Sequence, residues 1–527
     1  MSTKKIIYGI TYTWIRFAIG FLTTFTQAPL FFKYLSKEEV GIWFLFFSAA
    51  AFIQMSDFGL PSAVARAVAY IKNTSCSEQA EVIFYKKYTI GDIYNSALTS
   101  FTILSLPMIS IGITMLYVFK FGNGLTLFTS NDVVIAFTIF LIGILFNMTA
   151  DIPNACLNGL GDVGYDSLLR IIIQTLGLIT IWLSLPLYPS IKTLALIYLA
   201  QGILTTFIVN WFLKYKHKSL FANKGKVDLS LIRHLYRESL PLFINQIGSW
   251  LTNQSSIWIA TAILGASKIA DFSVLTQLIF YGLSISMSIP AAINPHAANA
   301  FSIGGINSLK KFFFLTLKLS SIIIGTWILI LSVWGETIMT LWVGSGHYLG
   351  FYVLVPLLIN LFFEMQHSIS GGFVWNTGKW PFVPATLSAG ILNMVFGILG
   401  CQYFGLPGLA IGTMLAKLLT LNWYVTFFAL QRLKISKMDY IVNYFTPTII
   451  LLIIVLICSN FLNSKLILFE SNLIFKNTPF NLIFSLVIGS IITTLIWIIL
   501  YYFTVFSKSE KNSISIKLYN FIYARRH

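Results

Sequence analysis

Three basic side chains lie inside segments that are otherwise apolar enough to cross a membrane: Arg16, Lys318 and Lys417. A charged residue at the centre of a membrane helix costs about 2.5–3.5 kcal/mol on insertion scales, so a sequence that keeps one gains something from it. Guanidinium and ammonium groups bind phosphate oxygens, and guanidinium does so through two parallel hydrogen bonds. These cations therefore favour an anionic substrate.

The three cations differ in their expected depth. Arg16 is predicted to lie about ten residues into its helix, roughly 15 Å from the surface and near the bilayer centre. Lys417 is similarly deep, whereas Lys318 is close enough to the inner face to extend its ammonium to water. The alternative for Arg16 is a structural role, in which it pairs with an acid such as Asp57 or Glu364.

Four titratable residues are candidates for coupling transport to H⁺ or Na⁺: Glu364, His367, Asp57 and Asp151. Glu364 and His367 are three residues apart and share one helix face, where burial would change their protonation. The alternative is a polar contact between helices, and Asp151 could simply lie at the cytoplasmic interface. The four cysteines are scattered without metal-ligand spacing, so neither a metal nor another cofactor is expected.

A polar stripe recurs in two apolar segments 229 residues apart. It aligns these residues at helical spacing: Arg16, Gly20, Thr23 and Gln27 with Asn245, Ser249, Thr252 and Ser256. Lipid cannot satisfy such groups, so the stripe points into protein or a water-filled cavity. The repeat predicts a two-lobed transporter with a central cavity, in which Gln27, Asn147 and Asn245 offer hydrogen bonds to the substrate.

The elements that position these residues are membrane helices. The chain has 527 residues, 57% hydrophobic and only 10% charged, which excludes an ordinary soluble domain. Spans of roughly 20 residues are expected at 8–32, 40–58, 91–119, 132–154, 168–188, 192–213, 239–263, 270–294, 312–335, 349–372, 381–401, 406–430, 441–462 and 480–506. The basic N-terminus and the apolar run that follows are interpreted as a retained first span rather than a signal peptide.

The charges outside the spans define the topology. With both termini in the cytoplasm, 25 of the 35 Lys and Arg residues fall on the cytoplasmic side and 7 on the other. The net charge of +17 is therefore explained by topology and does not indicate nucleic-acid binding. The predicted regions are an N-lobe at 1–214, a basic cytoplasmic linker at 215–237, a C-lobe at 238–431, two further spans at 432–507 and a basic tail at 508–527.

Two of the cytoplasmic segments have specific expectations. The linker is predicted to lie on anionic lipid, and the tail is predicted to form an amphipathic helix on the membrane surface. Residues 59–90 are expected to form a long loop after the second span.

Four short motifs each combine an acidic residue with glycine or proline. Residues 37–43 read Lys-Glu-Glu-Val-Gly-Ile-Trp, and residues 57–61 read Asp-Phe-Gly-Leu-Pro. Two further motifs are Leu-Asn-Gly-Leu-Gly-Asp at 157–162 and Glu-Ser-Leu-Pro-Leu at 238–242. They are similar to the sequences that end the fourth span and begin the seventh span of polysaccharide flippases. The motifs cover the first 300 residues, and the rest matches mainly in topology. The chain thus resembles Wzx-type O-antigen flippases of the multidrug/oligosaccharidyl-lipid/polysaccharide superfamily.

The resemblance implies two six-helix lobes as in MATE transporters, with two extra C-terminal helices. It also implies a substrate: a polyprenyl-pyrophosphate-linked oligosaccharide, passed to the outer leaflet of the bacterial inner membrane, with other polysaccharide-assembly membrane proteins as partners. The chain differs from drug-exporting relatives because Arg16 replaces the acid that many of them carry in the first span. No catalysis is expected. The alternatives are a MurJ-like peptidoglycan-precursor flippase, a MATE-like exporter of organic cations, and a membrane glycan ligase or polymerase.

Overall fold

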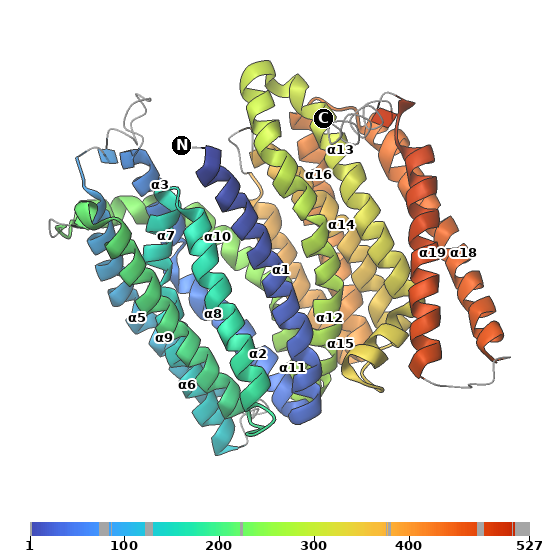
Figure 1. Ribbon diagram of the computed structural model, residues 1–527, viewed down its shortest axis with the longest axis horizontal. Helices are drawn as coiled ribbons and strands as arrows, with labels where there is room; N and C mark the ends of the chain where they lie inside the picture. Colours follow the sequence, from blue (N-terminus) through green and yellow to red (C-terminus); the bar gives the residue numbers. More distant parts are fainter. Residues whose placement is uncertain are drawn as a thin grey trace, which may run out of the picture. The chain divides into compact units, whose positions relative to one another are not determined.

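A computed structural model describes residues 3–72, 84–85, 87–121, 130–221, 225–375, 377, 381–471, 479–508 and 510–511. Every long regular element in these ranges is a helix (Figure 1). The all-α membrane fold expected from the sequence is therefore confirmed. The predicted amphipathic helix of the tail lies outside the described residues. The chain divides into two compact units, residues 1–273 and 274–527, which are described separately.

The first unit is built from ten α-helices and the start of α12. Their bounds are α1 Thr3–Tyr34, α2 Lys37–Gln54, α3 Leu60–Lys72, α5 Ile90–Phe121, α6 Asn131–Thr149, α7 Asp151–Gly159, α8 Val163–Ser184, α9 Ile191–Lys216, α10 Leu229–Asn253, α11 Ser255–Leu264 and α12 Ala266–Ser286. α1 packs along α8, α6 along α9, and α3 against α7 (Figure 1). Three pairs of helices therefore form the frame of this unit.

Local capping begins the helices that carry the flippase-like motifs. Ser36 and Glu39 form a reciprocal capping box at the start of α2, in which the Ser36 hydroxyl accepts from the Glu39 amide at 3.2 Å. Asp228 caps α10 by accepting from the amides of Ser230 and Leu231. These hydrogen bonds to the Asp228 carboxylate hold its pKa below the ordinary value. Glu39, within one of these motifs, and Asp228, ten residues before another, thus help to begin the helices that carry the motifs.

The segment expected to be a long loop after the second span contains a helix. α3 occupies Leu60–Lys72, with Pro61 in its first turn. Proline lacks a backbone N–H, but in the first turn this group has no acceptor within the helix, so no hydrogen bond is lost. Asp57 ends the preceding helical turn, and Phe58 and Gly59 adopt positive φ values of 54° and 72°. The expectation of a loop over all of 59–90 was wrong because Pro61 starts a helix here and does not merely end one.

α10 and α11 pack with the helices of the first unit. The indole nitrogen of Trp258 donates to the Ser48 hydroxyl at 2.8 Å, and that of Trp250 donates to the Ser48 carbonyl at 3.2 Å. Lys37 pairs with Asp271 at 2.8 Å. The first compact unit is defined by such contacts, so it extends past the predicted linker to residue 273. The predicted lobe limits at residues 214 and 238 therefore stay a prediction.

The second unit contains the rest of α12 and the remaining described helices. They are α13 Ser288–Val343, α14 Phe351–Trp375, α15 Val383–Leu419, α16 Leu421–Arg432, α17 Lys437–Tyr440, a π-turn at Ile441–Phe445, α18 Thr446–Ser471 and α19 Pro479–Val505. α19 packs on α18 and α13 (Figure 1). The Trp497 indole donates to the Ile322 carbonyl at 3.0 Å, beside Gly325. The two C-terminal helices are thus packed into this unit.

α15 is a hairpin of two antiparallel helices. Gly405 has φ 62° and ψ −142° and reverses the chain. A Cβ at Gly408 would lie 2.0 Å from the Gly400 carbonyl oxygen, and one at Gly412 would lie 2.5 Å from that of Phe396. Residues this far apart along one straight helix cannot touch, since each residue adds about 1.5 Å. The two spans predicted at 381–401 and 406–430 are therefore distinct.

Twelve described segments are long and apolar enough to cross a membrane. The difference from the fourteen expected has two causes. The hairpin is counted once, as Val383–Arg432. The span expected at 239–263 is divided between α10, whose first turns are charged, and α11, which has only 10 residues. If the hairpin counts as two spans and α10 with α11 as one, the described helices match the expected pattern.

The hairpin gives a stability prediction. Gly408→Val is expected to destabilise the protein by about 3 kcal/mol or more, because the added carbons meet backbone that cannot move aside. Thermal unfolding of purified protein measures this. Gly20→Ala is the matched control, since no atom lies within 4 Å of a Cβ at Gly20 and alanine favours a helix. An unchanged midpoint for Gly408→Val would contradict the hairpin.

Candidate functional site

Arg16 lies on α1 beside the first turn of α8. Its NH1 atom is 3.8 Å from Asp166 Oδ2, and three residues earlier the hydroxyls of Thr13 and Ser167 are 3.2 Å apart. The Arg16 side chain is 38% exposed and that of Asp166 only 4%. A separation of 3.8 Å is an ion pair without a hydrogen bond. Arg16 therefore has guanidinium N–H groups with which to contact an anion.

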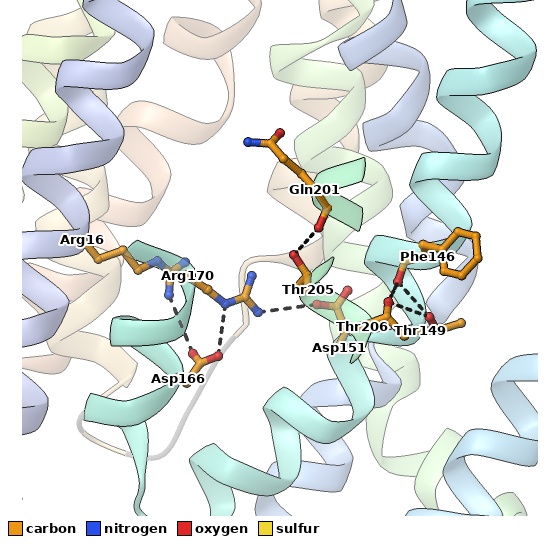
Figure 2. A network of polar contacts seen from close by, with 9 residues as sticks. All are labelled: Arg16, Phe146, Thr149, Asp151, Asp166, Arg170, Gln201, Thr205 and Thr206. Atoms are coloured by element: carbon orange, nitrogen blue, oxygen red, sulfur yellow. Dashed lines mark hydrogen bonds and ion pairs between the residues drawn. The ribbon is translucent and has the colours of Figure 1, made fainter. Parts of the chain in front are cut away.

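Arg170 extends this contact into a chain of alternating charges (Figure 2). Its Nε donates to Asp166 Oδ1 at 3.1 Å, and its NH2 atom is 3.7 Å from Asp151 Oδ1. The order is Arg16, Asp166, Arg170, Asp151, with α1, α8 and α7 supplying the side chains. The structure thus connects a predicted anion-binding residue, Arg16, with a predicted coupling residue, Asp151, through two residues that the sequence did not single out.

The turn between α7 and α8 brings the two carboxylates to the same place. Gly161 has a φ of 73°, which glycine adopts without strain. Its amide donates to the Asn158 carbonyl at 2.9 Å, and the next amide, of Asp162, donates to Leu157 at 2.9 Å. These bonds satisfy the last carbonyls of α7. α8 then begins at Val163, and Asp166 is in its first turn, where the helix dipole favours a negative charge.

Hydroxyl groups of α6 and α9 lie near Asp151 (Figure 2). Thr206 Oγ1 donates to the Phe146 carbonyl at 2.5 Å and is 3.3 Å from Thr149 Oγ1, while Thr205 donates to the Gln201 carbonyl at 2.7 Å. These bonds join or stabilise the two helices. Thr206 thus links α9 to α6.

Arg16 lies in the middle part of α1, which runs from Thr3 to Tyr34. Its neighbour Asp166 lies in the first turn of α8. The depth of Arg16 in the membrane stays a prediction.

The partner of Arg16 differs from the two acids considered from the sequence. Asp57 Oδ1 accepts from the Gly59 amide at 2.6 Å and thereby stabilises the turn before α3. Glu364 belongs to the second unit, where Lys417 is its partner. Asp166 was missed because it follows a Gly-rich turn and was counted with the loop.

The predicted hydrogen-bonding residues of the first unit lie on three different helices. Gln27 and Asn245 are half-buried on α1 and α10. Asn147 is on α6, where its side-chain amide donates to the Gly143 carbonyl at 3.0 Å and lies beside Gly202 of α9. Their role in binding stays a prediction.

In the second unit, Lys417 and Glu364 form a buried ion pair. Lys417 Nζ is 2.9 Å from Glu364 Oε2, with side chains 2% and 13% exposed, and His367 Nε2 is 3.6 Å from Glu364 Oε1. α14 supplies Glu364 and His367, and the second helix of the α15 hairpin supplies Lys417. The three residues predicted separately as a cation and a coupling pair are therefore one cluster.

Lys318 forms an ion pair with Glu510, just after the end of α19. Its Nζ is 2.7 Å from Glu510 Oε2, and Glu510 also accepts from the Ser507 amide at 2.7 Å. Burial alone would raise the pKa of Glu510, but the hydrogen bond from Lys318 and that from Ser507 outweigh it and hold the pKa below the ordinary value. Lys318 is 5% exposed, so it is less accessible to an anion than Arg16.

The sequence matches a known protein family. A family model described as "Polysaccharide biosynthesis protein" matches residues 2–300, which is more than half of the chain. The chain belongs to this polysaccharide biosynthesis family. The match covers all of the motifs that resembled flippases, and the charged chain of α1, α7 and α8 lies within it. No curated protein matches the sequence closely enough to count as a relative.

Solved structures show the fold of this family member. A structure of the lipid II flippase MurJ in an inward closed conformation has a TM-score of 0.64 at 15% identity, covering 94% of this chain and 99% of that one. An inward-facing MATE multidrug transporter of the MOP superfamily has a TM-score of 0.62 at 15% identity, covering 81% and 98%. A MATE structure in complex with MaD3S reaches 0.58 at 16% identity. The fold is therefore that of the MurJ and MATE structures.

Proposed function

We propose that the protein is a flippase for a polyprenyl-pyrophosphate-linked oligosaccharide, an O-antigen or capsule repeat unit. It moves this lipid from the cytoplasmic to the outer leaflet of a bacterial inner membrane by alternating access. Both termini lie in the cytoplasm. The family match to polysaccharide biosynthesis and the transporter fold support the class of function. The positive charges of the predicted loops support the orientation.

The observation that carries the proposal is the exposed guanidinium of Arg16. It is the most exposed of the three cations within spans, at 38%, whereas Lys417 and Lys318 are 2% and 5% exposed and bonded to carboxylates. Arg16 therefore binds the pyrophosphate. Lys417 and Lys318 contribute to the electric field more than to direct contact.

The remaining predicted site residues have supporting roles in this proposal. Gln27, Asn147 and Asn245 offer hydrogen bonds to sugars, and the polyprenyl tail stays in lipid. Glu364 with His367 is the proposed coupling site for H⁺ or Na⁺, because a carboxylate and an imidazole lie 3.6 Å apart in a buried cluster. Asp57 and Asp151 are the second choice, since Asp57 caps a turn and Asp151 faces Arg170.

Deletion in the native host tests the function. Lipid-linked glycan is expected to accumulate in the cytoplasmic leaflet, and this is measured by analysing lipid-linked intermediates in each leaflet. The accumulating species also identifies the sugar unit. An unchanged distribution between leaflets, with loss of polymer length alone, would instead indicate a polymerase or ligase.

A second candidate is a flippase for a peptidoglycan precursor. It is favoured by the share of this chain that the lipid II flippase structure covers, 94% against 81% for the MATE structure. Complementation of a strain depleted of its precursor flippase separates the two. Restored growth would establish the second candidate, and continued lysis would favour the first.

A further inference from the structure

Asp166 is shared unequally between two guanidinium groups. Its Oδ1 accepts a hydrogen bond from Arg170 Nε at 3.1 Å, while its Oδ2 is 3.8 Å from Arg16 NH1. Charge-assisted N–H···O bonds are about 2.7–2.9 Å long, so only the contact with Arg170 approaches a true hydrogen bond. The carboxylate therefore belongs mainly to Arg170.

The local structure reinforces this preference. Asp166 and Arg170 are four residues apart on α8, with the acid nearer the N-terminus, which is the favourable orientation for a helical ion pair. Asp166 is 4% exposed. Arg16 reaches it from a different helix, α1. α8 thus holds the carboxylate by itself.

Arg170 is itself surrounded by negative charge. Besides Asp166 it faces Asp151, with NH2 and Oδ1 3.7 Å apart. A cation between two carboxylates attracts a further anion weakly, because its own charge is balanced. Among the described residues, Arg16 pairs with one carboxylate, at a longer distance, and has a larger exposed fraction than Arg170, 38% against 29%. The two arginines therefore have different roles.

We propose that Arg170 is a positioning residue that retains Asp166 and so leaves the guanidinium of Arg16 available to a phosphate-bearing anion. The proposal rests on the proposed function, in which that anion is the pyrophosphate of the lipid-linked glycan. Without Arg170, the Asp166 carboxylate moves from 3.8 Å to hydrogen-bond distance of Arg16 and neutralises it. Arg170 thus controls anion binding without contacting the anion.

Binding of inorganic pyrophosphate to the purified full-length protein tests this. Arg16→Gln and Arg170→Gln are each expected to weaken binding by about tenfold or more, the effect of losing one charged contact. Asp166→Asn is expected to bind at least as tightly as the original protein. The double variant Arg170→Gln with Asp166→Asn is expected to recover most of the affinity, because an amide does not neutralise Arg16.

Recovery of pyrophosphate affinity in the double variant distinguishes a positioning role of Arg170 from its other possible roles. If Arg170 contacted the anion directly, or only supported the fold, the double variant would bind as weakly as Arg170→Gln, and this result would overturn the proposal. So would pyrophosphate binding that does not depend on Arg16. Arg432→Gln is the matched control, since Arg432 lies in the second unit and donates to Thr377. Thermal unfolding of each variant identifies any that fails to fold.

The binding assay and the host deletion can fail independently. Leaflet distributions that do not change on deletion would refute the proposed function, even if pyrophosphate binding follows the expected pattern. Suppose that deletion makes lipid-linked glycan accumulate in the cytoplasmic leaflet, but the double variant does not recover pyrophosphate affinity. This result would refute only the proposed role of Arg170.

Discussion

Arg16→Glu is expected to abolish export of the lipid-linked glycan. The substitution replaces the most exposed of the three embedded cations, Arg16, Lys318 and Lys417, with a carboxylate facing Asp166, so both the substrate phosphate and Asp166 are repelled. A lost charged hydrogen bond alone corresponds to about 1.5–3 kcal/mol, or roughly tenfold to a hundredfold in affinity. Surface glycan per cell, at matched protein levels, measures the effect.

Two milder substitutions at Arg16 separate charge from folding. Arg16→Gln removes the charge without introducing repulsion and is expected to lose most of the export. Arg16→Lys keeps the charge but not the forked geometry, so an intermediate level is expected. Full export by Arg16→Glu and Arg16→Gln would show that Arg16 does not anchor the substrate.

Lys417→Met is expected to destabilise the protein by about 3–5 kcal/mol, the cost of leaving one member of a buried ion pair without the other. Glu364 is 13% exposed, and His367, at 3.6 Å, is too distant to replace the 2.9 Å bond from Lys417. The midpoint of thermal unfolding should therefore fall clearly.

The double variant Lys417→Met with Glu364→Gln provides the control. It removes both charges, so most of the lost stability should return. If the single variant unfolds like the original protein, the ion pair contributes little. If the double variant is as unstable as the single one, the loss comes from packing of the Lys417 side chain and not from its charge.

The helices and the embedded cations could be predicted from the sequence. Arg16 and Lys417 are conspicuous because they interrupt apolar runs. The break at Gly405 is also readable, since glycine and proline adjoin there and the two spans on either side are each long enough to cross a membrane. These features depend on residues close together in the chain.

The partners of the cations could not be predicted in the same way. Asp166 reaches Arg16 only because the turn at Gly161 returns the chain along α7 and because α1 packs on α8. Glu364 was considered for Arg16, but it meets Lys417, because the hairpin at Gly405 places Lys417 opposite α14. The i, i+4 spacing of Asp166 and Arg170 was an available signal, but the predicted start of the fifth span at residue 168 separated the two residues.

Transport by purified protein tests the central claim most directly. The protein is reconstituted into vesicles containing the host's polyprenyl-pyrophosphate-linked glycan, and the fraction of glycan that becomes accessible at the outer leaflet is followed over time. Rapid movement is expected with the original protein and at least about tenfold slower movement with Arg16→Gln, because one charged contact is lost. Equal rates for the two proteins, or no movement above protein-free vesicles, would contradict the central claim.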